Sequence, residues 1–361
     1  MGRRFAFLAS VLVVLLAVAG GSSGQTPQDL VDQVSQAQYT AYQVTVQNMG
    51  LGLYGGAAYD QGYRNRYNSG GPALESLGFQ EANLYLTQTF AALSPSLVVS
   101  THGSYKNVIA ELPGTDPDPA VRDRIYIISG HYDHPAGNVD APGGDDNASG
   151  TAAVLEAARI MSQFQFRSTV RFIAWGGEEG WMLGSKEYVA NVVMANGEDI
   201  GGMLNLDMIL HPRMDNVPGG GVLDLDVSTK LDVPGAAALY DAFAAAAAAY
   251  APSLLLDTRN PQTDDWYPSD QGAFLEMGYA GLMIAENNAT EIWGGSMAGY
   301  HTAADASDRA EGEHYNYAWA TEVVKATVGA VAGQAQVVPE PATMALLALG
   351  GLAALAGRKR R

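Results

Sequence analysis

Histidine and carboxylate side chains follow the ends of several apolar segments in this chain of 361 residues. These potential metal ligands are His131, Asp133, Asp145, Asp146, Glu178, Glu179, Asp207 and His301. Taken singly, each has an ordinary structural explanation, since an Asp pair before a helix is usually a cap. The chain has no cysteine, so a metal site must be built from His, Asp and Glu. Together these residues supply the mixed nitrogen and oxygen ligands that suit a divalent ion such as zinc.

The number of these side chains fits a site with two metal ions. Two divalent ions that share one bridging carboxylate need about five protein ligands and a bridging water. Another carboxylate, free of metal, is needed to take a proton from that water. The adjacent Glu178 and Glu179 offer one carboxylate for each role. Asp133 lies two residues after His131, where it can orient the imidazole.

The apolar segments before these residues predict the strands of one sheet. Short β-branched or apolar runs predict strands at 107–112, 124–129, 169–174, 203–208, 222–227 and 281–284. Helical patterns lie at 74–93, 149–164, 184–193, 235–250 and 313–331. Strands separated by helices of this length indicate an α/β fold, a central mostly parallel mixed sheet with helices on both faces. In such a sheet, catalytic residues gather beyond the carboxyl ends of the strands.

Composition and charge exclude several classes of protein. The chain is 47% hydrophobic, and its 20 Lys and Arg against 38 Asp and Glu give a net charge of −18. Nucleic acids and anionic membrane surfaces reward basic patches, so neither is expected as the main partner. The absence of cysteine excludes disulfide scaffolds, iron–sulfur clusters and thiol catalysis.

The N-terminus has the pattern of a secretory signal. Arg3 and Arg4 precede an apolar run at 5–19, which ends in Ala17-Val18-Ala19. A basic start, a short apolar stretch and small residues at the end predict a signal peptide at 1–19. A linker and helical lead-in are expected at 20–75, and the catalytic domain at 76–335.

The C-terminus has a different sorting pattern. Val-Pro-Glu-Pro at 338–341 leads into an apolar run at 342–357 and four basic residues at 358–361. The apolar run is slightly short of a full membrane span, and the basic end fits a positive-inside stop. The segment 338–361 resembles a PEP-CTERM sorting tail. This resemblance implies an exported protein, transient membrane anchoring through the tail, and a processing protease as a partner.

Five motifs appear in the order in which one peptidase family carries them. They are G-H-Y-D, G-D-D-N-A-S-G, W-G-G-E-E-G-x-x-L-G-S, N-L-D-M-I and Y-H-T. Across about 80–335 the chain therefore resembles the double-zinc aminopeptidases, a family that includes glutamate carboxypeptidase and transferrin-receptor-like chains. The resemblance implies a single zinc-exopeptidase-like domain with two zinc ions. It also implies an aminopeptidase whose substrates are peptide or protein N-termini.

The same resemblance implies a metal-binding role for five residues. His131 and Asp207 would bind one zinc ion, and Glu179 and His301 the other. The bridging carboxylate would be Asp146, the acid of the D-x-x-S-G pattern, and not its neighbour in the Asp pair.

Three further residues receive catalytic roles from the resemblance. Glu178 would be the general base, and Asp133 would orient the first histidine. Tyr300, directly before the last histidine, would either polarise the scissile carbonyl or serve only in packing. The family often has Ser-Asp-His where this chain has Ser269-Asp270-Gln271. The missing histidine is not a metal ligand, so Gln271 concerns substrate positioning.

Two alternative functions remain open at the level of sequence. One is a glutaminyl cyclase-like acyltransferase, which has the same fold and uses one zinc ion. The other is a non-catalytic binding domain of the receptor type, which the intact ligand set and Glu178 disfavour. Zinc stoichiometry and hydrolysis of aminoacyl amides distinguish these alternatives from an aminopeptidase.

Overall fold

The computed structural model describes residues 25–68, 74–135, 139–212, 224–257, 269–286 and 299–339. Pro27–Gln336 forms one compact unit, and a second unit comprises Met1–Thr26 and Val337–Arg361. The predicted signal peptide at 1–19 and nearly all of the predicted tail at 338–361 lie outside the described residues. Within the described residues, no helix has the length and apolar character needed to cross a membrane.

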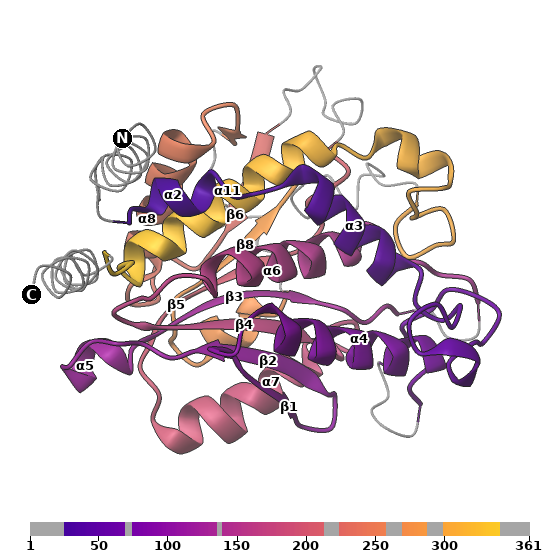
Figure 1. Ribbon diagram of the computed structural model, residues 1–361, viewed down its shortest axis with the longest axis horizontal. Helices are drawn as coiled ribbons and strands as arrows, with labels where there is room; N and C mark the ends of the chain where they lie inside the picture. Colours follow the sequence, from indigo (N-terminus) through magenta and orange to yellow (C-terminus); the bar gives the residue numbers. More distant parts are fainter. Residues whose placement is uncertain are drawn as a thin grey trace, which may run out of the picture. The chain divides into compact units, whose positions relative to one another are not determined.

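A mixed sheet of eight strands forms the centre of the larger unit (Figure 1). Its strands are β1 (Val98–His102), β2 (Asn107–Leu112), β3 (Ile125–His131), β4 (Thr169–Trp175), β5 (Ile200–Leu206), β6 (Asp224–Ser228), β7 (Leu255–Leu256) and β8 (Gly281–Ala285). Their order in the sheet is β1-β2-β4-β3-β5-β8-β6-β7. The central strands β4, β3, β5 and β8 are parallel, and β1 and β2 form an antiparallel edge. The predicted α/β class with a mixed, mostly parallel sheet is confirmed.

Helices cover both faces of this sheet (Figure 1). The α-helices are α2 (Pro27–Val31), α3 (Gln36–Gln47), α4 (Leu77–Leu93), α5 (Pro119–Arg122), α6 (Ala148–Met161), α7 (Leu183–Tyr188), α8 (Ala236–Tyr250), α9 (Gln271–Glu276) and α11 (Tyr317–Gln334). Other helical segments are the 3-10 helices η1 (Gly56–Ala58) and η4 (Ala310–His314) and the π-helix η2 (Val189–Met194). α6 and α11 pack on the central strands, and α2 and α3 pack against these two helices. α7 lies on the opposite face and contacts α9.

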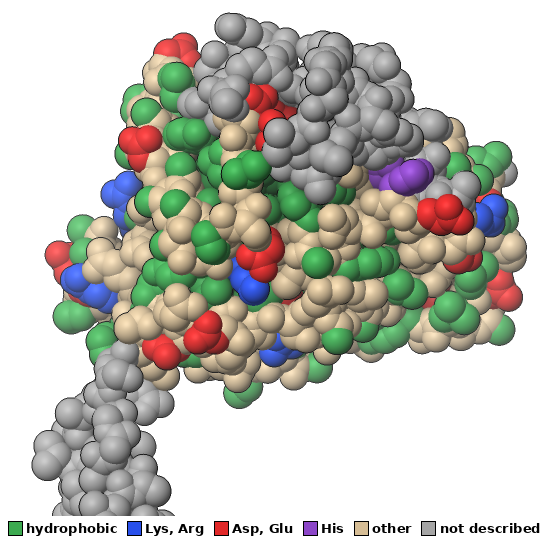
Figure 2. All heavy atoms as spheres, turned by 90° about the horizontal axis from the view of Figure 1, so that it is seen from above, with side chains coloured by type: hydrophobic (Ala, Val, Ile, Leu, Met, Phe, Trp, Pro, Cys, Tyr) green, Lys and Arg blue, Asp and Glu red, His purple; other side chains and the backbone are tan. Residues whose placement is uncertain are grey.

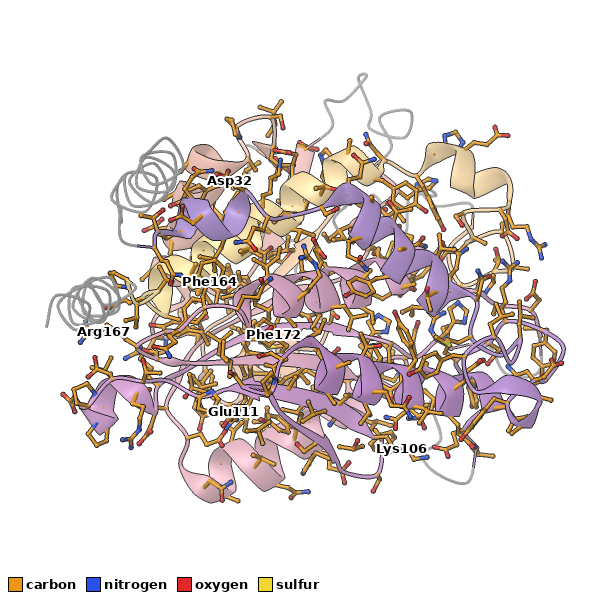
Figure 3. All side chains as sticks on the ribbon, viewed as in Figure 1. Asp32, Lys106, Glu111, Phe164, Arg167 and Phe172 are labelled. Atoms are coloured by element: carbon orange, nitrogen blue, oxygen red, sulfur yellow. The ribbon has the colours of Figure 1, made fainter. Side chains whose placement is uncertain are left out.

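The central strands are buried on both faces because both are covered. All seven residues of β3 are buried, which is the pattern of a parallel strand between two helical layers. On β4, Phe172 and Trp175 are fully buried, and the side chains in Figure 3 fill the space between sheet and helices. Such strands appear in the sequence as continuous apolar runs, which is why they are recognisable there.

The parallel register aligns the ends of the three central strands. His131, the last residue of β3, pairs with Trp175, the last residue of β4. On the other side of β3, Ser129 pairs with Asn205 of β5, which ends at the next residue. The residues that follow β3, β4 and β5 are therefore brought to the same edge of the sheet.

Some element boundaries differ from those predicted. β5 begins three residues earlier than the predicted strand at 203–208, because Gly201 and Gly202 join it despite their low strand propensity. A side chain at Gly202 would meet Leu239 of α8 at 2.6 Å, so the glycine permits close packing of that helix. α11 begins at Tyr317 instead of 313, because the Asn316 side chain caps it by accepting the N–H of Trp319. The predicted strand at 222–227 corresponds to β6, and its first two positions lie outside the described residues.

The segment expected as a lead-in packs within the larger unit. α3 contacts α6, and α2 contacts α11. Leu30, Tyr39 and Val46 are fully buried in this packing. The compact unit thus begins at Pro27, well before the domain start predicted at residue 76.

Candidate metal centre

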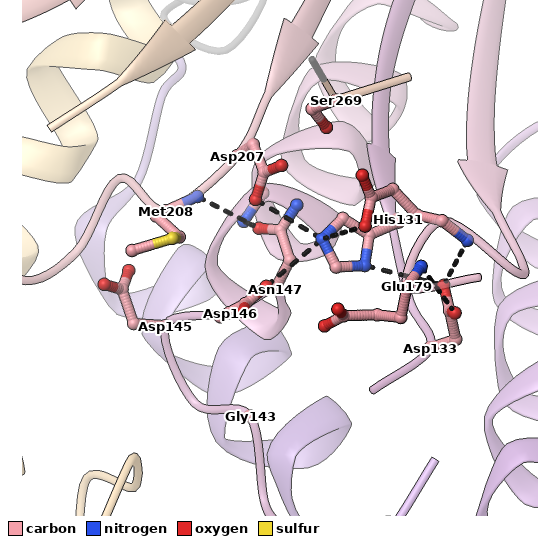
Figure 4. Close-up of polar contacts among 12 residues, drawn as sticks. His131, Asp133, Gly143, Asp145, Asp146, Asn147, Glu179, Asp207, Met208 and Ser269 are labelled. Carbon is pink, nitrogen blue, oxygen red and sulfur yellow. Dashed lines mark hydrogen bonds and ion pairs between the residues drawn. The ribbon is translucent and has the colours of Figure 1, made fainter. Parts of the chain in front are cut away.

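The predicted ligands come together where three neighbouring strands end. His131 ends β3, Glu179 follows β4 and Asp207 follows β5 directly. Asp146 lies immediately before the N-cap residue of α6, and His301 lies in a loop before η4. Figure 4 shows how the first four of these side chains converge.

Asp146 lies between the two histidines. Its Oδ1 is 3.2 Å from Nε2 of His131, and its Oδ2 is 3.0 Å from Nε2 of His301. Oδ1 of Asp207 lies 3.3 Å from Nε2 of His131, and Oε2 of Glu179 lies 3.2 Å from Nε2 of His301. The five residues thus form two groups, each with one histidine, and Asp146 belongs to both.

The chemistry of these atoms fits two metal ions. Within each group the potential ligand atoms all lie within 4.8 Å of one another. Oε1 of Glu179 is buried and has no hydrogen-bond partner among the described residues. Buried polar atoms normally have such a partner, and a metal ion would satisfy this oxygen. Two imidazoles and three carboxylates are hard, mixed ligands of the kind that zinc accepts.

Electrostatics in the site favour protonated histidines when metal is not bound. Burial lowers the pKa of His301, but hydrogen bonds with Asp146 and Glu179 outweigh it and raise the pKa to about 10. Burial and the neighbouring Asp146 raise the pKa of Glu179 to about 8. The site therefore holds protons that a metal ion would displace.

Asp133 connects the first histidine with the turn after β4. Its carboxylate accepts the N–H groups of Glu178 and Glu179, at 3.2 and 3.3 Å. Its Oδ1 also lies 3.5 Å from Nδ1 of His131, the ring nitrogen that faces away from Asp146 (Figure 4). One fully buried side chain therefore fixes both the imidazole and the Glu pair.

Glu178 lies beside His131 and, with His131 and Glu179, forms a further group that could hold a metal ion. Its Oε2 is 4.0 Å from Nε2 of His131. Its side chain is 12% exposed, against 7% for Glu179 and 4% for Asp146. Burial and the neighbouring carboxylates, partly offset by His131, raise the pKa of Glu178 well above its usual value. A partly accessible carboxyl with this pKa is suited to proton transfer.

The ring of Tyr300 contacts two neighbouring side chains. The ring stacks on the imidazole of His301, with centroids 3.7 Å apart, and packs against Met208. His301 itself has a φ of 58°, an unusual backbone conformation for this residue type. The contact places the tyrosine next to the second group of ligands.

The loop that carries Asp146 is fixed by the start of α6. Asn147 caps this helix, since its Oδ1 accepts the N–H of Gly150 at 2.7 Å and its Nδ2 donates to the Leu206 carbonyl at 2.9 Å. The Asp146–Asn147 peptide bond is cis. A Cβ at Gly150 would lie 2.1 Å from the Leu206 carbonyl oxygen, so glycine is required for this close approach. The N-A-S-G part of the motif thus joins α6 to the strand before Asp207.

The family resemblance assigns no role to four buried acidic residues near the ligands. They are Asp145, Asp270, Glu286 and Asp305. In the sequence Asp145 stands out only as the neighbour of the bridge, and Asp305 follows Y-H-T by three residues. Neither oxygen of Asp270 has a hydrogen-bond partner in the described part of the chain. Glu286 follows β8 directly, which is the same strand-end signal that identified the other carboxylates.

Gln271 begins α9 in a buried position. Its Oε1 accepts the N–H of Ser269 at 3.2 Å. Ser269 also accepts from Asn205, whose Oδ1 accepts from Ser129 of β3. The Ser-Asp-Gln segment is thereby attached to the strands that carry the site.

Two family models match this chain. The model of peptidase family M28 matches residues 107–322, and that of the PEP-CTERM protein-sorting motif matches 337–361. A probable zinc metalloprotease of Pyrenophora tritici-repentis is 39% identical over 108 residues, 28% of this chain and 21% of that protein. The chain spans less than half the length of the curated relatives it matches.

Solved structures share the fold at low identity. The LapA aminopeptidase of Legionella pneumophila is 15% identical with a TM-score of 0.63, over 86% of this chain and 74% of that one. A glutaminyl cyclase of Porphyromonas gingivalis is 16% identical with a TM-score of 0.60, over 84% of this chain and 99% of that one. The fold is therefore common to a peptidase and a cyclase.

Proposed function

Because the chain belongs to peptidase family M28, we propose that it is an exported zinc aminopeptidase that removes residues from the N-termini of peptides or proteins. The observation that carries this proposal is the position of Asp146 between two histidine-containing groups of ligands. Such an arrangement suits two metal ions that share one carboxylate.

We assign the ligands as the geometry groups them. His131 and Asp207 would hold the first zinc ion, Glu179 and His301 would hold the second, and Asp146 would serve both. When bound, the two ions would acidify a water molecule and polarise the scissile carbonyl. The absence of cysteine ligands leaves a nitrogen and oxygen site, as family membership leads us to expect.

The remaining site residues move protons or orient other groups. Glu178 takes a proton from the attacking water and then gives one to the leaving amine. Asp133 holds the turn that carries Glu178, through the two N–H groups of the Glu pair. Tyr300, stacked beside the second histidine, is assigned to the scissile carbonyl, whose developing charge a hydroxyl would stabilise.

The acidic character of the site supports the choice of an aminopeptidase. Several buried carboxylates surround the ligands, and a substrate with a free α-ammonium group would meet complementary charge there. The ion pair would fix the first peptide carbonyl beside the metal ions, which is orientation catalysis.

A peptide and its N-acetylated form test this choice directly. We expect the free peptide alone to lose single N-terminal residues, as followed by product masses over time. Cleavage of both peptides at equal rates, or fragments from the middle of the chain, would identify an endopeptidase instead.

The shared fold keeps a glutaminyl cyclase as a second candidate. The cyclase would use one zinc ion and release ammonia from an N-terminal glutamine instead of hydrolysing peptide bonds. Elemental analysis of the purified protein and an assay on aminoacyl amides separate the two. A receptor-like domain would bind without hydrolysis, and the position of Glu178 beside the ligands disfavours it.

An exported enzyme would meet its substrates outside the cytoplasm. The sorting motif at 337–361 is present, and we propose that a signal peptide at 1–19 directs secretion. We further propose that the tail anchors the protein in the membrane until a sorting protease removes it. The catalytic activity is assigned to the compact unit Pro27–Gln336.

A further inference from the structure

Asp305 makes contact with the loop of Asp146 at three consecutive residues. Its Oδ1 accepts the N–H of Asp145 at 2.8 Å, and its Oδ2 accepts the N–H of Asp146 at 3.1 Å. Its backbone carbonyl accepts the N–H of Gly144 at 2.9 Å. Asp305 is 1% exposed, so water does not compete for these hydrogen bonds.

Asp305 is also closely connected to His301. The two residues lie four positions apart, and the turn between them is closed by N–H groups of Thr302 and Asp305 that donate to the carbonyls of Gly299 and Thr302. The hydroxyl of Tyr315 donates a hydrogen bond to Oδ1 of Asp305. The carboxylate is thus held between the loop of the second histidine and the loop of Asp146.

Asp145 extends this connection to the third loop of the site. Its Oδ1 accepts the N–H of Leu210 at 2.9 Å, three residues after Asp207. Asp145 thereby links the segment after β5 to the same stretch of backbone that Asp305 holds. Two buried carboxylates that lie outside the ligand groups therefore connect the loops of Asp146 and His301 with the segment after Asp207.

We propose that Asp305 is a positioning residue, which holds Asp146 and His301 at the separation needed for one metal ion to bind both. The proposal rests on the proposed two-metal function. Partners that orient a ligand in this way typically contribute about 10-fold to 100-fold to metal affinity.

A carboxylate is needed at this position for a simple reason. Its two oxygens accept two parallel N–H groups, one from each residue of the Asp pair. Asn has one acceptor and one donor, so Asp305→Asn would turn an N–H donor toward one of these N–H groups. This isosteric substitution keeps the volume of the side chain and removes one of its two acceptor oxygens.

The experiment compares Asp305→Asn with Asp308→Asn in the full-length chain. Asp308 lies in the same loop, but its side chain is 63% exposed and pairs with Arg64, away from the ligands. Zinc is titrated into the metal-free proteins against a competing chelator, which gives the affinity of each equivalent. Cobalt replaces zinc in a parallel titration, because its absorption spectrum reports the geometry of each occupied site.

We expect Asp305→Asn to lower the affinity for the second zinc equivalent by at least about tenfold, with a smaller effect on the affinity for the first. The cobalt spectrum of the second equivalent should change, and Asp308→Asn should match the unmodified protein. Equal weakening of both equivalents with a lowered unfolding midpoint of the metal-free protein would show a merely structural role. Unchanged affinities and spectra would overturn the proposal as well.

Tyr315→Phe provides a second variant in case Asp305→Asn does not fold. It retains the carboxylate and removes one of its donors, so we expect a smaller selective weakening of the second equivalent. Unaltered binding in this variant would then count against the proposal. If the unmodified protein takes up only one zinc ion, the two-metal function fails. The role of Asp305 is then judged on that ion alone, with weaker binding in Asp305→Asn as support and unchanged binding as refutation.

Discussion

Two adjacent glutamates in this site face different partners. Oε2 of Glu179 lies 3.2 Å from the imidazole of His301, whereas Oε2 of Glu178 lies 4.0 Å from that of His131. Their backbone N–H groups both donate to Asp133, which holds the turn between them. Substituting each glutamate in turn can therefore distinguish a metal ligand from a general base.

Glu178→Gln should retain both metal ions and lose at least about a hundredfold in turnover, because a general base is removed. Glu179→Gln is the matched control, identical in chemistry and one residue away. It should weaken binding of the second zinc ion, since the amide is a poorer ligand. Steady-state kinetics and metal analysis of both variants check this, and full activity of Glu178→Gln would mean that the two roles are assigned in the wrong order.

Zinc affinity should rise with pH. Hydrogen bonds with Asp146 and Glu179 outweigh burial and raise the pKa of His301 to about 10, so the imidazole carries a proton at neutral pH without metal. Zinc must displace this proton, and its apparent affinity therefore increases as the pH approaches 10. Binding measured from about pH 6 to about pH 8 should strengthen about tenfold per unit for each proton released. Affinity that is independent of pH would contradict the arrangement.

The sequence indicates the proposed ligand residues more clearly than the residues that support them. His131, Glu179 and Asp207 follow strands, Asp146 precedes α6 and His301 lies in a loop, and the structure brings all five together. The supporting carboxylate at position 305 acts through backbone N–H groups about 160 residues earlier, which no local spacing shows. Its role depends on a loop-to-loop contact that only the fold creates.

At the scale of elements, the start of α6 determines where the bridging carboxylate lies. The cap residue Asn147 holds Gly150 and the Leu206 carbonyl together, so α6 and β5 approach closely at this point. The approach leaves no room for a Cβ on the helix. The position of α6 and the position of Asp146 are therefore coupled.

Gly150→Ala should destabilise the protein, because the new Cβ would lie 2.1 Å from the Leu206 carbonyl oxygen. Overpacking of this kind typically costs about 1–3 kcal/mol of unfolding free energy. Gly333→Ala in α11 is the matched control, since a Cβ there would have no other atom within 4 Å, and it should be neutral or stabilising. Urea unfolding of the two variants measures the difference. Equal unfolding midpoints would show that the backbone around Gly150 adjusts to the new Cβ without loss of stability.

Elements with continuous apolar runs were predictable, and those with mixed surfaces were not. β2, β3, β4 and β8 lie within two residues of their predicted bounds, because both faces of each are covered. β1 is an edge strand with no fully buried residue, so its sequence lacks that pattern. α3 buries Gln43 and Gln47, whose side chains form hydrogen bonds with Gly144 and Ser307. Because these buried residues are polar, the sequence of α3 lacks the apolar periodicity by which a buried helix face is recognised.

At the scale of the molecule, the surface agrees with the acidic composition. The described part of the face in Figure 2 shows acidic, basic and hydrophobic side chains interspersed, with no continuous basic patch. Over the whole chain the net charge is −18. The described part of this face therefore has no basic patch of the kind that concentrates nucleic acid.

A chain that ends at Val337 should fold and retain full activity, because Val337–Arg361 belongs to a separate unit. A chain that ends at Gln334 should be less stable. It loses the carbonyls of Ala335 and Gln336, which accept the N–H groups of Ser168 and Arg167, the latter labelled in Figure 3. Two lost hydrogen bonds correspond to about 1–3 kcal/mol.

Urea unfolding and aminopeptidase assays of the two truncated chains measure the difference. Both should be compared after export, with the proposed signal peptide at 1–19 retained in the gene. An inactive or unfolded chain ending at Val337 would show that the tail contributes to the folded domain. Equal stability of the two chains would show that the hydrogen bonds of Arg167 and Ser168 do not stabilise the protein.

The segment before α4 has a bearing on how the activity is switched on. Arg66 is fully buried and donates to the carbonyls of Val46, Tyr132, Pro142 and Gly143, so it joins this segment to both loops that carry the first histidine and the bridge. Trimming the chain past this arginine would leave those carbonyls without donors and release the metal loops. A segment that extends past Arg66 is therefore unsuited to serve as a removable activation peptide. Any inhibitory propeptide would have to be cut before this residue.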